Sequence, residues 1–236
     1  MNPNYIYQTI HTLSHHPHHV ASHCRLLERH FLDIYFRPLR LDEEQIEREI
    51  VELLGRERVT RTVSVFVELR VDIEQEMELS LCGVSLYDGY AMRSISPRAA
   101  LVTFDSPFGL QPNTARRRAL DFASDIARNI GGEIAVECNR AGHICSLGGA
   151  ALFAVEGRRL IASTAFESVE RNLIIEAAAE LSIEVVQRPI VRHELHTVDE
   201  LFGCDHQGVI ASSSYGDHLF MSIIANKIAS QLTQPW

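Results

Sequence analysis

Residues 142–215 decide the fold, and they read GHICSLGGAALFAVEGRRLIASTAFESVERNLIIEAAAELSIEVVQRPIVRHELHTVDELFGCDHQGVIASSSY. Apolar runs bounded by polar turns predict strands at 151–155, 160–163 and 183–187. Residues 169–181 carry apolar side chains at helical spacing and follow Ser168, a favourable N-cap residue. A second short helix is expected at about 197–201. The stretch therefore predicts strands alternating with helices, as in a mixed α and β layer.

Six pieces of this stretch carry a family resemblance. They are Gly142-His-Ile-Cys-Ser, Ala151-Leu-Phe-Ala-Val, Ser168-Val-Glu-Arg, Glu184-Val-Val-Gln-Arg-Pro-Ile, Asp199-Glu-Leu-Phe and Gln207-Gly-Val-Ile-Ala-Ser. In order and punctuation they resemble the C-terminal half of the class IV aminotransferases. That pyridoxal-phosphate group, fold type IV, includes branched-chain aminotransferases and aminodeoxychorismate lyase. The resemblance implies an α+β protein of two domains, an N-terminal α/β two-layer domain and a C-terminal barrel-like α/β domain.

The N-terminal part of the chain predicts two helices on an antiparallel sheet. The helices are expected at 20–36 and 41–55, the second with Asp42 as N-cap and Gly55 as its stop. Strands are expected at 61–71, 78–84 and 98–103. Two prolines and a glycine within residues 105–113 make the strongest break in the chain. We therefore expect domains at 1–107 and 108–236.

The C-terminal part opens and closes with helices. Residues 114–130 predict a helix that ends at Gly131-Gly132, followed by a strand at 133–138, and residues 217–232 predict the last helix. The face of the first helix expected to point inward consists of Ala115, Ala119, Phe122, Ala123, Ile126 and Ile130.

Composition narrows the function classes. With 46% hydrophobic and 22% charged residues the chain is typical of globular proteins, and no apolar run approaches the roughly 20 residues that a membrane span needs. A net charge of −9 argues against nucleic acid as a partner. The five cysteines are widely spaced and predict free thiols rather than a disulfide framework. The N-terminus lacks a signal-like segment, so we expect a cytoplasmic protein without nucleic-acid or membrane partners.

The resemblance implies catalytic residues that this sequence lacks. A pyridoxal-phosphate enzyme holds its cofactor as an imine with a lysine amine. Counting from the matched motifs places that lysine on Pro112 or Asn113, and neither can form an imine. The only lysine of the chain is Lys227, in the last predicted helix. The glutamate that holds the pyridine nitrogen in the family matches Ser146, which offers a hydrogen bond but no charge.

The positions matched to cofactor binding are also altered. They are Arg25, Val169, Glu170, Ser212 and Ser213. Arg25 keeps the arginine of a family motif whose histidine is replaced here by Ser22. Where the family has Ile-Thr in the first turn of a helix, this chain has Val169-Glu170, and a carboxylate there repels a phosphate dianion.

Arginines could balance that carboxylate. We expect Glu170 to lie in the former phosphate site and to pair with Arg25 or with one of Arg116, Arg117 and Arg118. Alternatively, Glu170 points to solvent as an ordinary first-turn residue. The arginine triplet could equally be a solvated helix face.

A histidine cluster offers a second kind of site. Seven of the twelve histidines lie between residues 11 and 30. A transition-metal site could use His15, His16, His18, His19 and His23, because imidazole suits zinc, nickel and copper. The alternative is a solvated turn, since no cysteine or glutamate stands at ligand spacing.

Together these patterns predict a degenerate class IV aminotransferase homologue, a pseudoenzyme that has lost imine catalysis and binds no cofactor. Its cleft would be vestigial or would bind a small anion or metabolite. One alternative is a divergent aminotransferase or lyase that holds pyridoxal phosphate non-covalently, and another is a metal-binding protein. The resemblance further implies a homodimer, which is also the commonest assembly of soluble chains.

Overall fold

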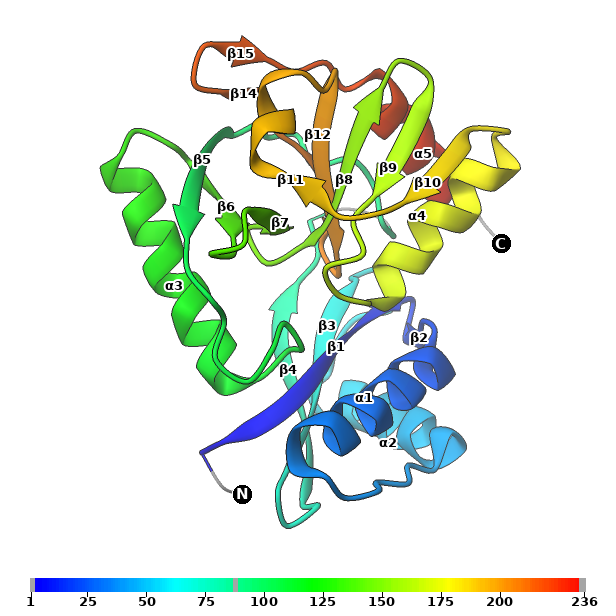
Figure 1. Cartoon of the computed structure of the whole chain (residues 1–236). Coiled ribbons are helices and arrows are strands. Elements are labelled where there is room, and N and C mark those ends of the chain that lie inside the picture. The colour runs from blue at the N-terminus through cyan, green and yellow to red at the C-terminus, as the bar shows by residue number, and fades with distance from the viewer. Residues whose placement is uncertain (1–2, 87–88, 234–236) are drawn as a thin grey trace.

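The computed structural model describes residues 3–86 and 89–233. Its N-terminal part is a four-stranded antiparallel sheet in the order β2-β1-β3-β4, with α1 and α2 packed on one face (Figure 1). The bounds are β1 Tyr5–Leu13, β2 His16–Pro17, α1 Val20–Tyr35, α2 Glu43–Arg56, β3 Val65–Asp72 and β4 Met77–Val84. The predicted helix pair on an antiparallel sheet is confirmed for these elements.

Local sequence explains where the two helices begin and end. The side chain of Asp42 accepts a hydrogen bond from the amide of Gln45 at 3.0 Å, so the predicted N-cap of α2 is confirmed. Helix α1 ends at Phe36, which adopts a left-handed conformation and donates its amide to the carbonyl of Leu32. Between the helices and the sheet lies an apolar core that includes Ile10, Phe31 and Ile50.

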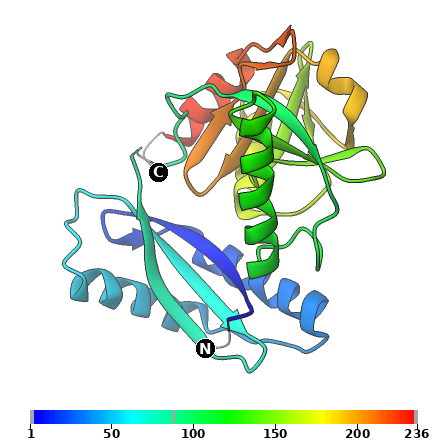
Figure 2. The same ribbon diagram turned by 90° about the vertical axis from the view of Figure 1, so that its left-hand side faces the viewer.

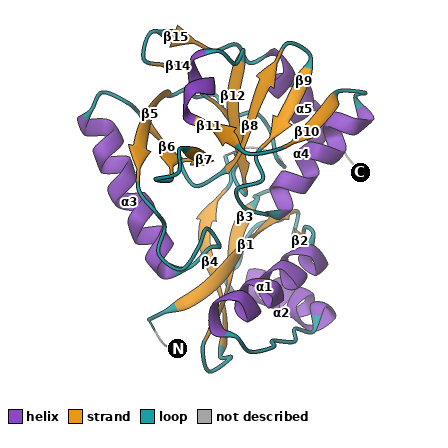
Figure 3. Cartoon of the chain, viewed as in Figure 1, coloured by secondary structure: helices purple, strands orange, loops and turns teal. Residues whose placement is uncertain are grey.

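The C-terminal part holds two sheets that face each other across a second core (Figure 3). One has the strand order β10-β9-β8-β12-β13, and the other has the order β11-β7-β6-β5-β14-β15. Helices α4 and α5 cover the outer face of the first sheet. The bounds are β5 Arg98–Thr103, α3 Thr114–Asn129, β6 Ile134–Cys138, β7 His143–Leu147, β8 Ala151–Glu156, β9 Arg159–Ala162, α4 Val169–Glu180, β10 Glu184–Gln187, β11 Ile190–Val191, η1 Arg192–His196, β12 Glu200–Asp205, β13 Gly208–Ala211, β14 Ser214–Tyr215, β15 His218–Leu219 and α5 Ile223–Leu232.

Strand β5 corrects one prediction about the sheets. It pairs parallel with β6 and β14 in the C-terminal part, whereas the sequence pattern had grouped it with the N-terminal antiparallel strands. The reason is the connection: β5, α3 and β6 form a parallel strand–helix–strand unit, and such a unit needs its helix as the crossover. The domain boundary at residue 107 stays a prediction, although β5 already belongs to a C-terminal sheet.

The short helix expected at 197–201 is also wrong. A 3₁₀ turn, η1, occupies Arg192–His196 instead, and strand β12 begins at Glu200. The carboxylate of Glu194 accepts from the amide of Val191 at 2.7 Å, which starts the turn earlier than expected. The residues after this turn are extended and form β12, which pairs with β8 and β13.

Helix α3 buries only part of the face predicted. Ala123 is buried as predicted, but Phe122 and Ile130 are 69% and 58% exposed. Arg116 and Ala127, which were not predicted to point inward, are buried as well. The small side chains of Ala123 and Ala127 pack against the neighbouring strands. Figure 2 shows α3 standing on the outside of the C-terminal part, facing the viewer. Within residues 3–86 and 89–233, no helix is long and apolar enough to cross a membrane.

Candidate functional site

A small cavity lies where the two parts of the chain meet. It has a volume of about 180 Å³. Its wall combines strand β1, helix α1, the segment before α3 and α3 itself, the turn between β7 and β8, the first turn of α4 with the residues before it, and the end of β12 with the residue that follows. The lining residues are Tyr7, Gln8, Thr9, Leu26, Pro112, Leu120, Gly148, Gly149, Ala150, Ala151, Phe166, Glu167, Ser168, Glu170, Cys204, Asp205 and His206.

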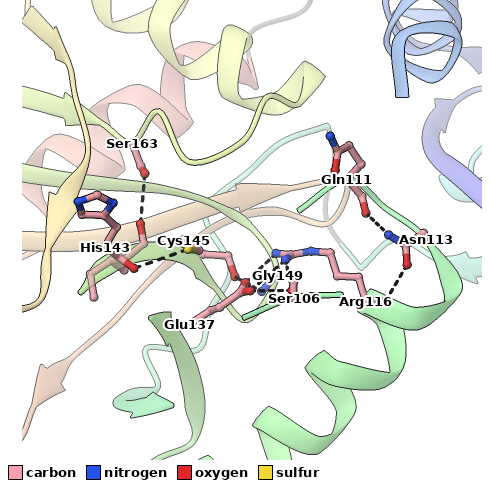
Figure 4. Close-up of polar contacts among 11 residues, drawn as sticks. Ser106, Gln111, Asn113, Arg116, Glu137, His143, Cys145, Gly149 and Ser163 are labelled. Atoms are coloured by element: carbon pink, nitrogen blue, oxygen red, sulfur yellow. Dashed lines mark hydrogen bonds and ion pairs between the residues drawn. The ribbon is translucent and has the colours of Figure 1, made fainter. Parts of the chain in front are cut away.

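The segment before α3 is fastened to strand β1. The amide of Tyr7 donates to the carbonyl of Pro112 at 3.2 Å, and Ile6 and Asn113 form a β-bridge. Asn113 is buried and caps α3, because its side chain accepts from the amide of Arg116 at 2.8 Å and donates to the carbonyl of Gln111 at 2.9 Å (Figure 4). Of the two positions matched to the family lysine, Pro112 therefore lines the cavity and Asn113 serves the helix.

A buried ion pair lies beside Ser146. The Ser146 hydroxyl donates to Oε2 of Glu137 at 2.7 Å. Arg116 donates to Oε1 and Oε2 of the same carboxylate at 3.0 and 2.8 Å (Figure 4). Ser106 completes the group through hydrogen bonds with both partners. Arg116 and Glu137 are only 3% and 1% exposed. The register of β6 and β7 places Glu137 directly opposite Ser146. A carboxylate therefore lies beside Ser146, but its negative charge is already balanced by Arg116.

The first turn of α4 carries a buried carboxylate. Ser168 caps the helix by accepting from the amide of Arg171 at 3.0 Å, as the sequence predicts. Val169 is buried in the apolar core. Glu170 is 7% exposed, and burial raises its pKa from 4.5 to about 7, with the negative charge of Asp205 acting in the same direction. Hydrogen bonds to its own amide and to Ser168 act against the rise.

The predicted partners of Glu170 lie elsewhere. Among the residues that the structure describes, no ion pair joins Glu170 to an arginine, so the predicted pairing is wrong. Arg25 is exposed and contacts Ser22 and Glu43. The arginine triplet diverges because consecutive helix residues point about 100° apart. Arg116 pairs with Glu137, Arg117 with Glu68, and Arg118 with Asp121 at the surface. The alternative, that Glu170 points to solvent, is wrong as well.

The serine turn matched to a phosphate loop lies away from the cavity wall. The Ser212 hydroxyl donates to the carbonyl of Pro97 at 2.9 Å, and the amide of Ser213 donates to the same carbonyl at 3.0 Å. Both therefore join the ends of β5 and β14. The residues that sequence reasoning missed are Asp205, the last residue of β12, and His206, the first residue of the turn to β13, which both line the cavity. Polar residues directly after a strand could have indicated them, but the helix expected at 197–201 concealed that strand.

The histidine cluster is divided between surface and core. His11, His23 and His30 are buried, whereas His16 is exposed. The rings of His11 and His18 have centroids 6.3 Å apart and meet edge to face. Within the described part of the chain, no three histidine, cysteine or acidic side chains are placed to hold a metal ion. The alternative of a histidine metal site therefore has no structural support.

Comparison with known proteins identifies the family. The family model described as amino-transferase class IV matches residues 6–205. The chain belongs to this family. Among curated proteins, a search finds no significant match to the sequence.

Solved structures of aminotransferases share the fold of this class IV chain. A branched-chain aminotransferase from Thermoproteus uzoniensis with norvaline is 17% identical, with a TM-score of 0.79 over 97% of this chain and 84% of that one. An aminotransferase from Brucella abortus bound to the cofactor PLP is 12% identical, with a TM-score of 0.80 over 97% and 87%. The branched-chain aminotransferase of Escherichia coli is 17% identical, with a TM-score of 0.72 over 95% and 82%. At these identities the likeness shows the fold alone.

The cavity of this family member does not fit pyridoxal phosphate held as an imine. Its wall holds Pro112, one of the two positions that the sequence matches to the family lysine, and the other matched position, Asn113, is used as a helix cap. Ser146 supplies a hydroxyl whose hydrogen bond already goes to Glu137. At the phosphate end, the buried carboxylate of Glu170 lies in the helix turn where a dianion would need donors.

Proposed function

We propose that this class IV family member is a pseudoenzyme that performs no imine chemistry on pyridoxal phosphate. Its cavity serves as a binding site for a small metabolite. One observation carries the proposal: among the described residues, the cavity wall contains no lysine and no arginine, but it contains Glu167, Glu170 and Asp205. Both the covalent attachment and the phosphate recognition of such a cofactor need cationic or amine groups there.

Two properties of the wall weigh against the neighbouring hypotheses. An enzyme that holds the phosphorylated cofactor without a covalent link would still need donors for a dianion, and Glu170 repels one. The same charge makes a small anion a poor ligand, so within this proposal a metabolite without net negative charge is favoured.

All five cysteines are free thiols, as in reducing compartments, and we propose a cytoplasmic location.

We further propose that the protein is a homodimer. Phe122, Ile126 and Ile130 are exposed at spacings of four residues along α3, so they form an apolar stripe on the outer face of the helix. A stripe of this kind is unusual on a fully solvated helix and is typical of an interface.

Lysine restoration tests the pseudoenzyme proposal. Pro112→Lys places an amine in the cavity wall, and Asn113→Lys, which also removes the α3 cap, is the matched control. Each protein is incubated with pyridoxal phosphate, reduced with borohydride and mapped by mass spectrometry, and a panel of L-amino acids is assayed for amino transfer. We expect wild type to be modified at most on Lys227 or the terminal amine, and all three proteins to show no turnover, because Glu170 and the Arg116–Glu137 pair remain. Turnover by wild type would overturn the proposal, and turnover by Pro112→Lys would show that Glu170 and the Arg116–Glu137 pair do not block the chemistry.

A further inference from the structure

A second cavity lies at the end of the C-terminal part opposite the N-terminal sheet, beside β14 (Figure 1). It has a volume of about 540 Å³, and β5, the end of α3, η1 and β14 contribute to its wall. The basic residues of that wall are Arg98, Arg192 and His196, and among the described residues the wall contains no carboxylate. The chain as a whole carries a net charge of −9, so this wall is a local basic region that favours an acidic ligand.

The cavity follows an edge of strand β5 that is only partly paired. On one side, β5 pairs with β6 over residues 99–103, whereas on the other side β14 pairs only with Arg98 and Ala99. Among the described residues, no strand therefore lies beside residues 100–103 on the second side, and we call these residues the open edge of β5. Ala100, Leu101 and Thr103 all line the cavity, so the cavity runs along the open edge.

The open edge presents backbone groups that have no partner. The amide of Phe104 donates to the carbonyl of Cys138 in β6 at 3.0 Å. Because successive residues of a strand direct their backbone groups to opposite edges, Leu101 and Thr103 direct theirs away from β6. Among the described residues, no backbone hydrogen bond outside the paired strands reaches either of them. An edge of this kind is a template for an added strand.

Basic side chains lie on both faces of the sheet at the open edge. On the face that packs against α3, Arg98 forms an ion pair with Glu133 at 3.5 Å, and both side chains are more than half exposed. On the face that turns to the core between the two sheets, η1 brings Arg192 and His196 to the cavity. Arg192 is exposed, and among the described residues no ion pair occupies it. Since the side chains of a strand alternate between two faces, a strand with acidic residues at successive positions meets a basic group on each face.

Backbone and charge together define a partner. We propose that the open edge of β5 binds an extended peptide segment with acidic side chains, which adds to the sheet as a further strand. Its backbone exchanges hydrogen bonds with Leu101 and Thr103, and its carboxylates face Arg98 on one side of the sheet and Arg192 on the other. The site is separate from the cavity between the two parts of the chain and is independent of the proposed function.

A small anion suits this cavity less well than a peptide. The two arginines lie on opposite faces of the sheet, so a single phosphate or carboxylate pairs with one of them and leaves the backbone groups of the open edge unpaired. A peptide strand contacts both faces and pairs its backbone along the edge, which is the source of affinity in strand-edge recognition. The wall also offers the half-buried Leu101 and the exposed Ile130 to apolar side chains of the peptide.

Fluorescence anisotropy with a labelled peptide tests this interaction. The probe is a capped peptide of sequence Val-Glu-Glu-Val-Glu-Glu-Val, which places glutamates on both faces of a strand. We expect saturable binding to wild type that weakens with added salt, and at least about tenfold weaker binding when lysine replaces every glutamate. The backbone control is the acidic peptide with an N-methyl group on each glutamate, which keeps the charge but removes amide donors on both edges. It should bind at least about tenfold more weakly.

Variants of the chain locate the site. Thr103→Pro removes the amide at the open edge but leaves the hydrogen bonds to β6 in place, so it should weaken the acidic peptide at least about fivefold. Thr103→Val is the matched control, because it keeps the amide, and affinity should change less than about twofold. Arg192→Gln should weaken binding about threefold. Arg158→Gln alters an exposed arginine between β8 and β9 and should change affinity less than about twofold.

The controls separate strand addition from attraction by charge alone. Saturable binding that is lost on N-methylation of the peptide and weakened in Thr103→Pro supports the inference. Absence of binding by the acidic peptide, equal affinity for its N-methylated form, or inorganic phosphate that competes as strongly as the peptide would overturn it. Thermal unfolding shows that each variant is folded, and the N-methylated peptide tests wild type without any substitution.

Discussion

Removing one partner of the buried Arg116–Glu137 ion pair gives a quantitative test of the site, measured as a change in the free energy of unfolding. Arg116→Met removes the guanidinium but keeps an unbranched side chain in a helix position that tolerates methionine well. Among the described residues, the variant leaves the Glu137 carboxylate, which is 1% exposed, with the hydroxyls of Ser106 and Ser146 as its side-chain donors. Removing one partner of a buried ion pair typically costs about 3–5 kcal/mol.

Proton uptake limits that cost and makes it depend on pH. A carboxyl group of ordinary pKa about 4.3 takes up a proton at a cost of about 3.7 kcal/mol at pH 7 and about 1 kcal/mol at pH 5. We therefore expect Arg116→Met to lower the free energy of unfolding by about 3–4 kcal/mol at pH 7 and by about 1–2 kcal/mol at pH 5.

Urea unfolding of variant and wild type at both pH values, at one protein concentration, measures the difference. Arg118→Met is the matched control, because that exposed arginine lies two residues along the same helix, and it should change stability by less than about 0.5 kcal/mol. Adding Glu137→Met to Arg116→Met should recover most of the loss. A deficit below about 1 kcal/mol at pH 7, or one that does not shrink in acid, would refute the reasoning.

Three further results are expected. Burial lowers the pKa of His11 to about 4 and of His23 to about 3, both from 6.5. The folded protein therefore loses stability as pH falls below about 6.5, because the unfolded chain takes up protons that the buried rings do not. In urea unfolding, the free energy of unfolding of His11→Gln should fall by about 2 kcal/mol less than that of wild type between pH 7 and pH 5. Glu170 has the opposite effect, because its raised pKa means that stability is lost as pH rises through about 7. The free energy of unfolding of Glu170→Gln should therefore exceed that of wild type by up to about 3 kcal/mol at pH 8 and by less at pH 5. An unchanged pH profile of stability would contradict this. Light scattering should give twice the protomer mass of 26.6 kDa for wild type and for Phe36→Glu, but one protomer for Phe122→Glu, and a wild-type monomer at micromolar concentration would exclude the dimer.

Local signals predicted much of the fold because they act within a few residues. The N-caps Asp42 and Ser168 stand where the sequence placed them, and the strand pair β8 and β9 follows its apolar runs. Strand β5 shows the limit of such signals. Its partners β6 and β14 are about 35 and 115 residues away in sequence, and nothing in a run of six residues specifies which sheet it joins.

The sequence indicated candidate site residues but not the partners that those residues have in the structure. The motif alignment identified Ser146 as a position without charge. It did not indicate that Glu137, set opposite by the register of two strands, would place a carboxylate beside it. The buried histidines were missed for a similar reason, since a cluster of imidazoles suggests a surface or a metal, whereas His23 is satisfied in part by a glutamine from another element.

The arginine triplet explains why the start of α3 places no cation in the cavity wall formed by the described residues. Three consecutive arginines suggest one positive patch, but helix geometry sends each to a different place. Arg116 turns into the C-terminal part to meet Glu137, while Arg117 stacks on Tyr7 and reaches Glu68 of the N-terminal sheet. Both guanidinium groups are thus committed to fastening α3 between the two parts of the molecule, beside the bond from Tyr7 to Pro112. A segment held in this way can neither offer an amine to the cavity nor lend its charge to Glu170.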